Sequence, residues 1–159
     1  MSTMRPATPD DARAVAELME SRRVQYQAYQ PTFWRVAPDA VDRHVPFLRE
    51  VLGSPDTIAI VADRDDGGLA GAVLARIVPS PPVYAPGGPT CVIDDYWLAD
   101  TSAWQTLGVT LLSEVERVAK EVFAAAQAVV VCAQQDGPKR SMLQAETYSV
   151  ASEWWTKPL

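Results

Sequence analysis

The sequence predicts one mixed α/β domain that spans residues 1–159. Three observations carry this prediction. A chain of 159 residues is long enough to bury a core of its own. Strand-like and helix-like segments alternate along it, and residues 90–133 combine a strand, a long amphipathic helix and a second strand in a βαβ unit. The second strand, Ala128–Ala133, is a continuous apolar run, which is typical of a parallel strand buried on both faces.

The amino-terminal segment predicts a short strand that leads into a helix. Residues 4–7 form the strand. Thr8 is the expected N-cap, Pro9 occupies the first helical position, and Asp11 completes an arrangement like a capping box. The helical pattern fades after Arg23, so we expect the helix to end there.

Residues 39–78 predict a second helix and a hairpin. The helical pattern runs from Asp39 to a stop at Gly53, and Pro46 inside it is expected to kink or divide the helix. Thr57–Ala62 and Leu69–Val78 then form two strands, because a turn with adjacent glycines joins them.

The remaining elements follow from the same periodicities. A buried strand covers Cys91–Leu98, and the helix behind it begins at Gln105. A last helix from about residue 139 to 145 and a terminal strand, Val150–Thr156, complete the prediction. The long helix is expected to bury one apolar stripe, made of Leu111, Leu112, Val115, Val118, Ala119, Val122 and Phe123.

Composition excludes some classes of partner. Fourteen basic against twenty acidic residues give a net charge of −6 without a basic cluster, so nucleic acid is not expected to bind, whereas a cationic small molecule is attracted. No apolar run approaches membrane length and the first residues lack a signal-peptide pattern, so we expect a cytoplasmic protein that makes no membrane contact. Trp154 and Trp155 are expected to serve the core and the contact between two copies in a homodimer.

The cysteines and the single histidine predict no metal site. Cys91 and Cys132 lie in apolar strands, and two buried free thiols account for them better than a disulfide or a metal pair. One histidine without a Cys-x-x-Cys motif does not support structural zinc. His44 is expected at the surface of the second helix, with an acid or base role as the alternative.

A candidate binding site lies where the central strand meets its helix. A helix start presents free N–H groups and the positive end of the helix dipole, which suits a phosphate or pyrophosphate. Gly108 lies in the first turn, and Trp104 could cover such a ligand with its aromatic face. The alternative is an ordinary helix start in which Gly108 is needed for packing.

Four segments of the chain carry a family resemblance. They are Arg5–Asp11, Asp94–Leu98, the pattern Gln105-x-x-Gly108-x-Thr110 and Glu153–Leu159. They resemble, in turn, the opening, the central strand, the pyrophosphate loop and a common ending of the GNAT superfamily of acyl-CoA-dependent N-acyltransferases. The resemblance implies the order β-α-α-β-β-β-α-β-α-β around a central βαβ unit that binds acyl-CoA. Thr110 stands where glycine or alanine is usual, and residues 101–104 lengthen the loop.

The resemblance implies an N-acetyltransferase that moves an acetyl group from acetyl-CoA to a primary amine by direct attack on the thioester. The acceptor would be a small-molecule or peptide amine. The exposed backbone edge at Trp97 and Leu98 would hold the pantetheine arm. The diphosphate would lie on six residues of the loop: Gln105, Thr106, Leu107, Gly108, Val109 and Thr110.

Two carboxylates are candidates for the base that takes the amine proton. Adjacent strand residues point to opposite faces, so at most one of Asp94 and Asp95 is expected to face the amine, and Asp95 is preferred. Solvated or ion-paired carboxylates are the alternative for both. The family's usual acid is a tyrosine in the last helix, whereas the corresponding position here is Leu143.

Aromatic residues between the first two helices mark the expected acceptor site. Tyr29, Phe33 and Trp34, together with Tyr26, would form a cage for a cationic or ring-bearing amine. Packing of the second helix onto the sheet is the alternative.

Two further functions are weighed against the enzyme: a non-catalytic acyl-CoA-binding or regulatory protein, and a binding module without a CoA site.

Overall fold

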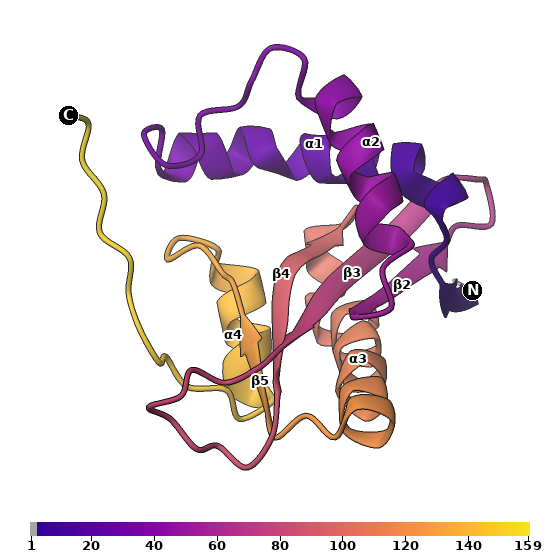
Figure 1. Ribbon diagram of the computed structural model, residues 1–159. Helices are drawn as coiled ribbons and strands as arrows, with labels where there is room; N and C mark the ends of the chain where they lie inside the picture. The colour runs from indigo at the N-terminus through magenta and orange to yellow at the C-terminus, as the bar shows by residue number, and fades with distance from the viewer. Residues whose placement is uncertain (1–2) are drawn as a thin grey trace.

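The computed structural model describes residues 3–159 and contains a five-stranded mixed sheet (Figure 1). The strands lie side by side in their order along the chain. The first four pair antiparallel, and the last pairs with its neighbour in parallel, as the βαβ unit requires. The strands are β1 (Thr3–Pro6), β2 (Thr57–Asp63), β3 (Leu69–Val78), β4 (Thr90–Leu98) and β5 (Gln127–Val130).

Helices cover both faces of the sheet (Figure 1). The first two pack with Val61, Ala72 and Trp97 on one face, and the last two pack with Ile60, Val73 and Tyr96 on the other. Within the described residues, no helix is long and apolar enough to cross a membrane. The helices are α1 (Ala12–Tyr29), α2 (Ala40–Leu52), α3 (Leu107–Phe123) and α4 (Gly137–Ala145), with 3-10 turns η1 (Pro9–Asp11) and η2 (Thr101–Gln105).

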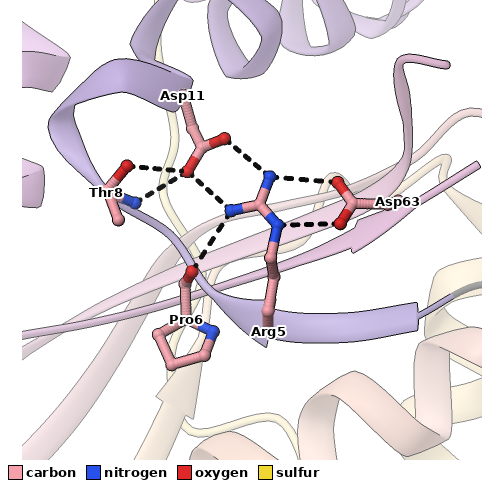
Figure 2. Close-up of polar contacts among 5 residues, drawn as sticks. All are labelled: Arg5, Pro6, Thr8, Asp11 and Asp63. Carbon is pink, nitrogen blue, oxygen red and sulfur yellow. Dashed lines mark hydrogen bonds and ion pairs between the residues drawn. The ribbon is translucent and has the colours of Figure 1, made fainter.

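Arg5 joins the leading strand to the start of the first helix and to the end of β2 (Figure 2). Its guanidinium donates to the two oxygens of Asp63 at 2.7 and 3.0 Å and to those of Asp11 at 2.8 and 2.9 Å. The Thr8 N–H also donates to Asp11, at 2.7 Å, which closes the predicted capping arrangement. The hydrogen bonds from Arg5 lower the pKa of the Asp11 carboxyl.

Both predicted amino-terminal helices form, with two differences. The first helix does not end after Arg23 but continues to Tyr29, because Tyr26 is buried on its inner face and extends the packed stripe. Pro46 lies inside α2 without dividing it. Val45, Leu48 and Leu52 bury the inner face of α2, and this packing holds the helix together across the hydrogen bond that proline lacks.

The central βαβ unit is confirmed, but it is buried less completely than predicted. Most of the α3 stripe is buried, whereas Val122 is 68% exposed near the end of the helix. β5 is shorter than the predicted strand and is not buried on both faces: Val129 is 40% exposed. The reason is its place in the sheet, because β5 is an edge strand with one strand partner among the described residues.

The predicted terminal strand, Val150–Thr156, is wrong. Aromatic residues favour strands, but a strand also needs a neighbouring edge, and residues 149–159 pair with none of the described strands. The tail instead runs back towards the loop between α1 and α2 (Figure 1), where the Trp154 ring meets Phe33 with centroids 5.8 Å apart. Trp154 and Trp155 are exposed and not part of the core, and their homodimer contact stays a prediction.

Candidate functional site

β4 contains a bulge at Asp94. Leu74 of β3 pairs with Asp95 and Ala75 pairs with Ile93, so Asp94 is an extra residue on β4. The bulge changes the face to which later side chains point. Ile93 belongs to the core beneath α3, whereas Asp95 lines a cleft on the α1 side of the sheet.

The cleft lies where β4 and β5 separate. Their parallel pairing covers only Thr90–Ile93 on β4, so the rest of β4 has no strand partner on this edge within the described chain. The cleft has a volume of about 330 Å³. Its walls come from α1, the loop between α1 and α2, β4, the segment after β5, and α4.

Both predicted base candidates line the cleft, which corrects the expectation that at most one would face it. The bulge is the reason, because it breaks the alternation of side chains at Asp94. Asp94 is exposed and accepts a hydrogen bond from Arg76 on β3 at 3.0 Å. Asp95 is half-buried and accepts one from the Trp97 indole at 3.1 Å. Asp95 therefore carries no ion pair among residues 3–159, unlike Asp94, and stays the preferred candidate for the base.

The aromatic acceptor cage forms in part. Phe33 and Trp34 line the cleft, but Tyr29 does not; Tyr26 from the same helix takes its place. The Tyr26 ring lies 4.9 Å from Trp34 and 4.8 Å from Trp97 between centroids, both edge to face. Tyr26 and Trp34 therefore pack with the core and form a wall of the cleft at the same time.

A buried hydrogen bond joins α1 to the start of α4. The Tyr26 hydroxyl donates to Asp136 at 2.7 Å, and burial beside that carboxylate raises the pKa of the Tyr26 phenol. Asp136 is itself buried and caps α4. This contact positions α4 against the cleft.

Replacement of Tyr26 with Phe is expected to lower the free energy of unfolding by about 1–3 kcal/mol, because Asp136 would be left buried without this donor. Urea denaturation measures the change. Tyr29→Phe is the matched control, since the Tyr29 hydroxyl meets Gln25 at the surface. Equal stabilities of the two variants would show that the buried bond contributes nothing.

Lys139 is the site residue that the sequence analysis missed. Its side chain is 1% exposed, lines the cleft, and crosses the gap between the separating strands. The ammonium donates to the carbonyl of Tyr96 on β4 at 3.2 Å and to that of Val131 after β5 at 2.9 Å. The sequence did contain a signal that Lys139 is buried. Lys139 shares a helix face with Met142 and Leu143, three and four residues further along, and both of these residues are buried.

The Lys139 contact shows which backbone groups of β4 face the gap between β4 and β5. In a strand, the N–H and C=O of one residue point to one edge and those of the next residue to the other. Because the Tyr96 carbonyl faces Lys139, the Tyr96 N–H faces the gap too, and so do the backbone groups of Leu98. The backbone of Trp97 faces β3 instead, which corrects half of the predicted edge.

The start of α3 is built around packing. A Cβ on Gly108 would lie 2.8 Å from the Trp104 ring and 3.4 Å from the Tyr96 hydroxyl, so the glycine is needed because Trp104 covers it. Trp104 is buried and does not lie open to cover a ligand. The Tyr96 hydroxyl donates to the Gly108 carbonyl. Residues 101–105 form the 3-10 turn η2 and not a free loop.

His44 is half-buried and not a surface residue as predicted. Its Nδ1 lies 2.9 Å from a guanidinium nitrogen of Arg23, and burial lowers the pKa of the imidazole.

Cys91 is buried and Cys132 half-buried, both as free thiols, and burial raises the pKa of Cys91 to about 11. In residues 3–159, no group of three His, Cys, Asp or Glu side chains is placed to hold a metal ion.

Solved structures share this architecture over nearly the whole chain. A tetramutant of the BH1408 protein from Bacillus halodurans superposes with a TM-score of 0.83 at 12% identity, with 99% of each chain covered. The aminoglycoside antibiotic 6'-N-acetyltransferase AAC(6')-Ih from Acinetobacter baumannii gives 0.73 at 15% identity, covering 100% of this chain and 99% of that chain. A predicted acetyltransferase from Clostridium acetobutylicum, solved with acetyl-CoA, gives 0.73 at 16%, covering 99% and 96%.

The chain has the GNAT fold, which it shares with these acetyltransferases. At these identities the likeness concerns the GNAT fold and not the reaction. A scan of protein-family models finds no match to the sequence, and no curated protein matches it either.

Acyl-CoA is the ligand that the GNAT fold implies, and three features of this chain fit it. The first turn of α3 contains no acidic residue that would repel a diphosphate. The edge of β4 at Tyr96 and Leu98 has no strand partner in the described part of the chain. The buried Trp104 Nε1 near this turn has no hydrogen-bond partner among residues 3–159. The hydrogen of Gly108 that a side chain would replace faces Trp104, so packing requires a glycine here, and its N–H stays one of the candidate donors at the helix start.

Proposed function

We propose that the protein is an N-acyltransferase that uses acyl-CoA, with acetyl-CoA as the default donor, and acylates a primary amine. One observation carries the proposal. In a GNAT fold, the half-buried Asp95 carboxylate lines a cleft beside the part of β4 that has no strand partner on the β5 side. A base and a row of backbone donors beside one cavity are what amine attack on a thioester needs.

Each part of the site has a separate task. An acyl-CoA supplies an acyl group that is activated as a thioester. The amides at the start of α3, from Leu107 to Val109, with the side chains of Gln105 and Thr106, would hold the diphosphate. The predicted Thr110 N–H is not among them, because it donates to the Thr106 carbonyl at 3.1 Å. The Tyr96 N–H, on the open edge of β4, would donate to the oxygen that becomes negative during attack. Asp95 would take the proton from the attacking amine, directly or through water.

The walls of the cleft favour an amine that carries a ring. Phe33, Trp34 and Tyr26 offer aromatic faces, and Asp95 attracts a cationic amine. The Acinetobacter neighbour is named for an antibiotic acceptor, whereas the aromatic wall of this chain suits a flat ring. A small aromatic amine or a peptide amine is the acceptor class that we propose.

Acetyl-CoA is expected to raise the stability of the protein by roughly 2–3 kcal/mol at a hundredfold excess over its dissociation constant, since it binds the folded state alone. Thermal unfolding with and without millimolar acetyl-CoA measures the shift. Desulfo-CoA serves as a second ligand that lacks the reacting sulfur. The absence of a shift with both ligands would remove acyl-CoA and favour a binding module of another kind.

Turnover separates an enzyme from a non-catalytic acyl-CoA-binding protein. Release of the CoA thiol is followed with 2-phenylethylamine, L-phenylalanine, butylamine and a peptide with a free amino terminus. Faster turnover of 2-phenylethylamine than of butylamine is expected, because only the former reaches the aromatic wall. A clear thermal shift without turnover of any amine would support the regulatory alternative. We consider this alternative because Leu143 occupies the position of the family's catalytic tyrosine.

A further inference from the structure

The Lys139 ammonium has one N–H donor without an acceptor among the described residues. An ammonium group carries three N–H donors. Two of them bond to the carbonyls of Tyr96 and Val131. Within the described residues, the group is otherwise surrounded by the rings of Tyr96, Trp97 and Trp104, whose centroids lie 5.1, 5.7 and 5.5 Å from Nζ. Rings at these distances stabilise a cation without taking its proton.

Lys139 and Asp95 line the same cleft from different elements. Asp95 lies on β4 beyond the bulge, and Lys139 reaches in from the first turn of α4. The lysine is held on three sides, by the two carbonyls and by the Asp136 cap that starts its helix. A proton acceptor and a proton donor are therefore fixed around one cavity before any substrate enters.

Burial lowers the pKa of the Lys139 ammonium, against the opposing effects of Cys132, Asp136 and Asp95. Tyr26 faces the same region through its bond to Asp136. A lysine whose pKa is lowered from its ordinary value gives up a proton more readily near neutral pH. The direction of this pKa shift agrees with a role as proton donor.

We propose that Lys139 is the catalytic acid of the acyl transfer and protonates the departing thiolate. The inference rests on the proposed function. The amine nitrogen forms a bond to the thioester carbonyl carbon, the carbon–sulfur bond breaks, and its electron pair leaves with sulfur. Lys139 gives its third proton to that sulfur and is protonated again by solvent. Asp95 takes the proton that the amine nitrogen loses. The free thiol and the amide are the products.

Three variants separate proton donation from a structural role. Lys139→Met removes the charge and the donors. Lys139→Arg keeps the charge and the donors for both carbonyls, but a guanidinium does not release a proton near neutral pH. Lys120→Met is the matched control, because Lys120 is exposed on α3. Thermal unfolding of each variant shows whether it is folded.

The leaving group provides the decisive readout. With acetyl-CoA and the fastest amine of the panel, both Lys139 variants are expected to lose about a hundred- to ten-thousand-fold in kcat, with little change in KM. With phenyl thioacetate, whose aryl thiolate leaves without a proton, the loss should shrink to less than about tenfold. Equal losses with the two thioesters, or normal turnover by Lys139→Arg, would overturn the proposal.

A titration of the wild-type protein keeps the test independent of turnover. The chain has three lysines, Lys120, Lys139 and Lys157, so protein labelled with ¹³C at lysine Cε gives a spectrum that is simple to assign by substitution. The Lys139 signal is expected to titrate at lower pH than the other two, and kcat should fall as the pH rises through that midpoint. A shared midpoint for all three would overturn the inference. No thermal shift and no turnover in the wild type would instead overturn the proposed function.

Discussion

Replacement of Asp95 with Asn is expected to lower kcat by about a hundred- to ten-thousand-fold and to leave the KM for both substrates nearly unchanged. Asparagine keeps the size of the side chain and can still accept the Trp97 indole bond, which is 3.1 Å long in the wild type. It loses the basicity needed to take the amine proton. Steady-state kinetics with acetyl-CoA and the amine panel measure the effect.

Asp94→Asn is the matched control for Asp95. Asp94 is its neighbour on the bulge and lines the same cleft, but it is exposed and bound to Arg76. A small effect on kcat is expected there. A larger loss for Asp94→Asn would move the base to that residue. Near-normal kcat and unchanged pH profiles for both variants would mean that the amine loses its proton to solvent.

Replacement of Gly108 with Glu is expected to destabilise the fold strongly, whether or not acyl-CoA binds. Sequence reasoning alone treats this glycine as a place where a phosphate comes close to the backbone. In the structure, a new Cβ would lie 2.8 Å from the Trp104 ring. Overpacking a core typically costs about 1–3 kcal/mol, and a carboxylate carried into this buried position adds to that. Urea denaturation at neutral pH measures the loss.

Alanine substitutions isolate the packing contribution. Gly108→Ala adds only the clashing methyl group, so a loss of about 1–3 kcal/mol is expected without any new charge. Gly137→Ala, at the start of α4, is the control, because a Cβ added there would have no neighbouring atom within 4 Å. That variant should be as stable as the wild type or up to about 1 kcal/mol more stable. If Gly108→Ala is equally stable, the Trp104 contact tolerates a side chain and the packing explanation is wrong.

Local sequence determined most of the secondary structure. The capping pattern from Thr8 to Asp11, the hairpin around the glycine turn and the apolar stripe of α3 each depend on residues close together in the chain. The bounds of β3 agree with the prediction at both ends. Such patterns can be predicted because capping, turn geometry and helical periodicity act over a few residues. The predicted fold class follows from their order.

Contacts between distant segments decided the site. The bulge at Asp94 depends on the register of β3 against β4, and it brings both aspartates to one cleft against the simple alternation rule. The buried position of Lys139 depends on where β4 and β5 part, which no single segment reveals. The terminal tail has the residues of a strand but no edge to pair with. Side-chain burial and strand pairing are decided by the neighbours that the fold supplies, so the sequence predicted the elements and only the tertiary structure brought Lys139, Asp95 and the unpaired part of β4 together.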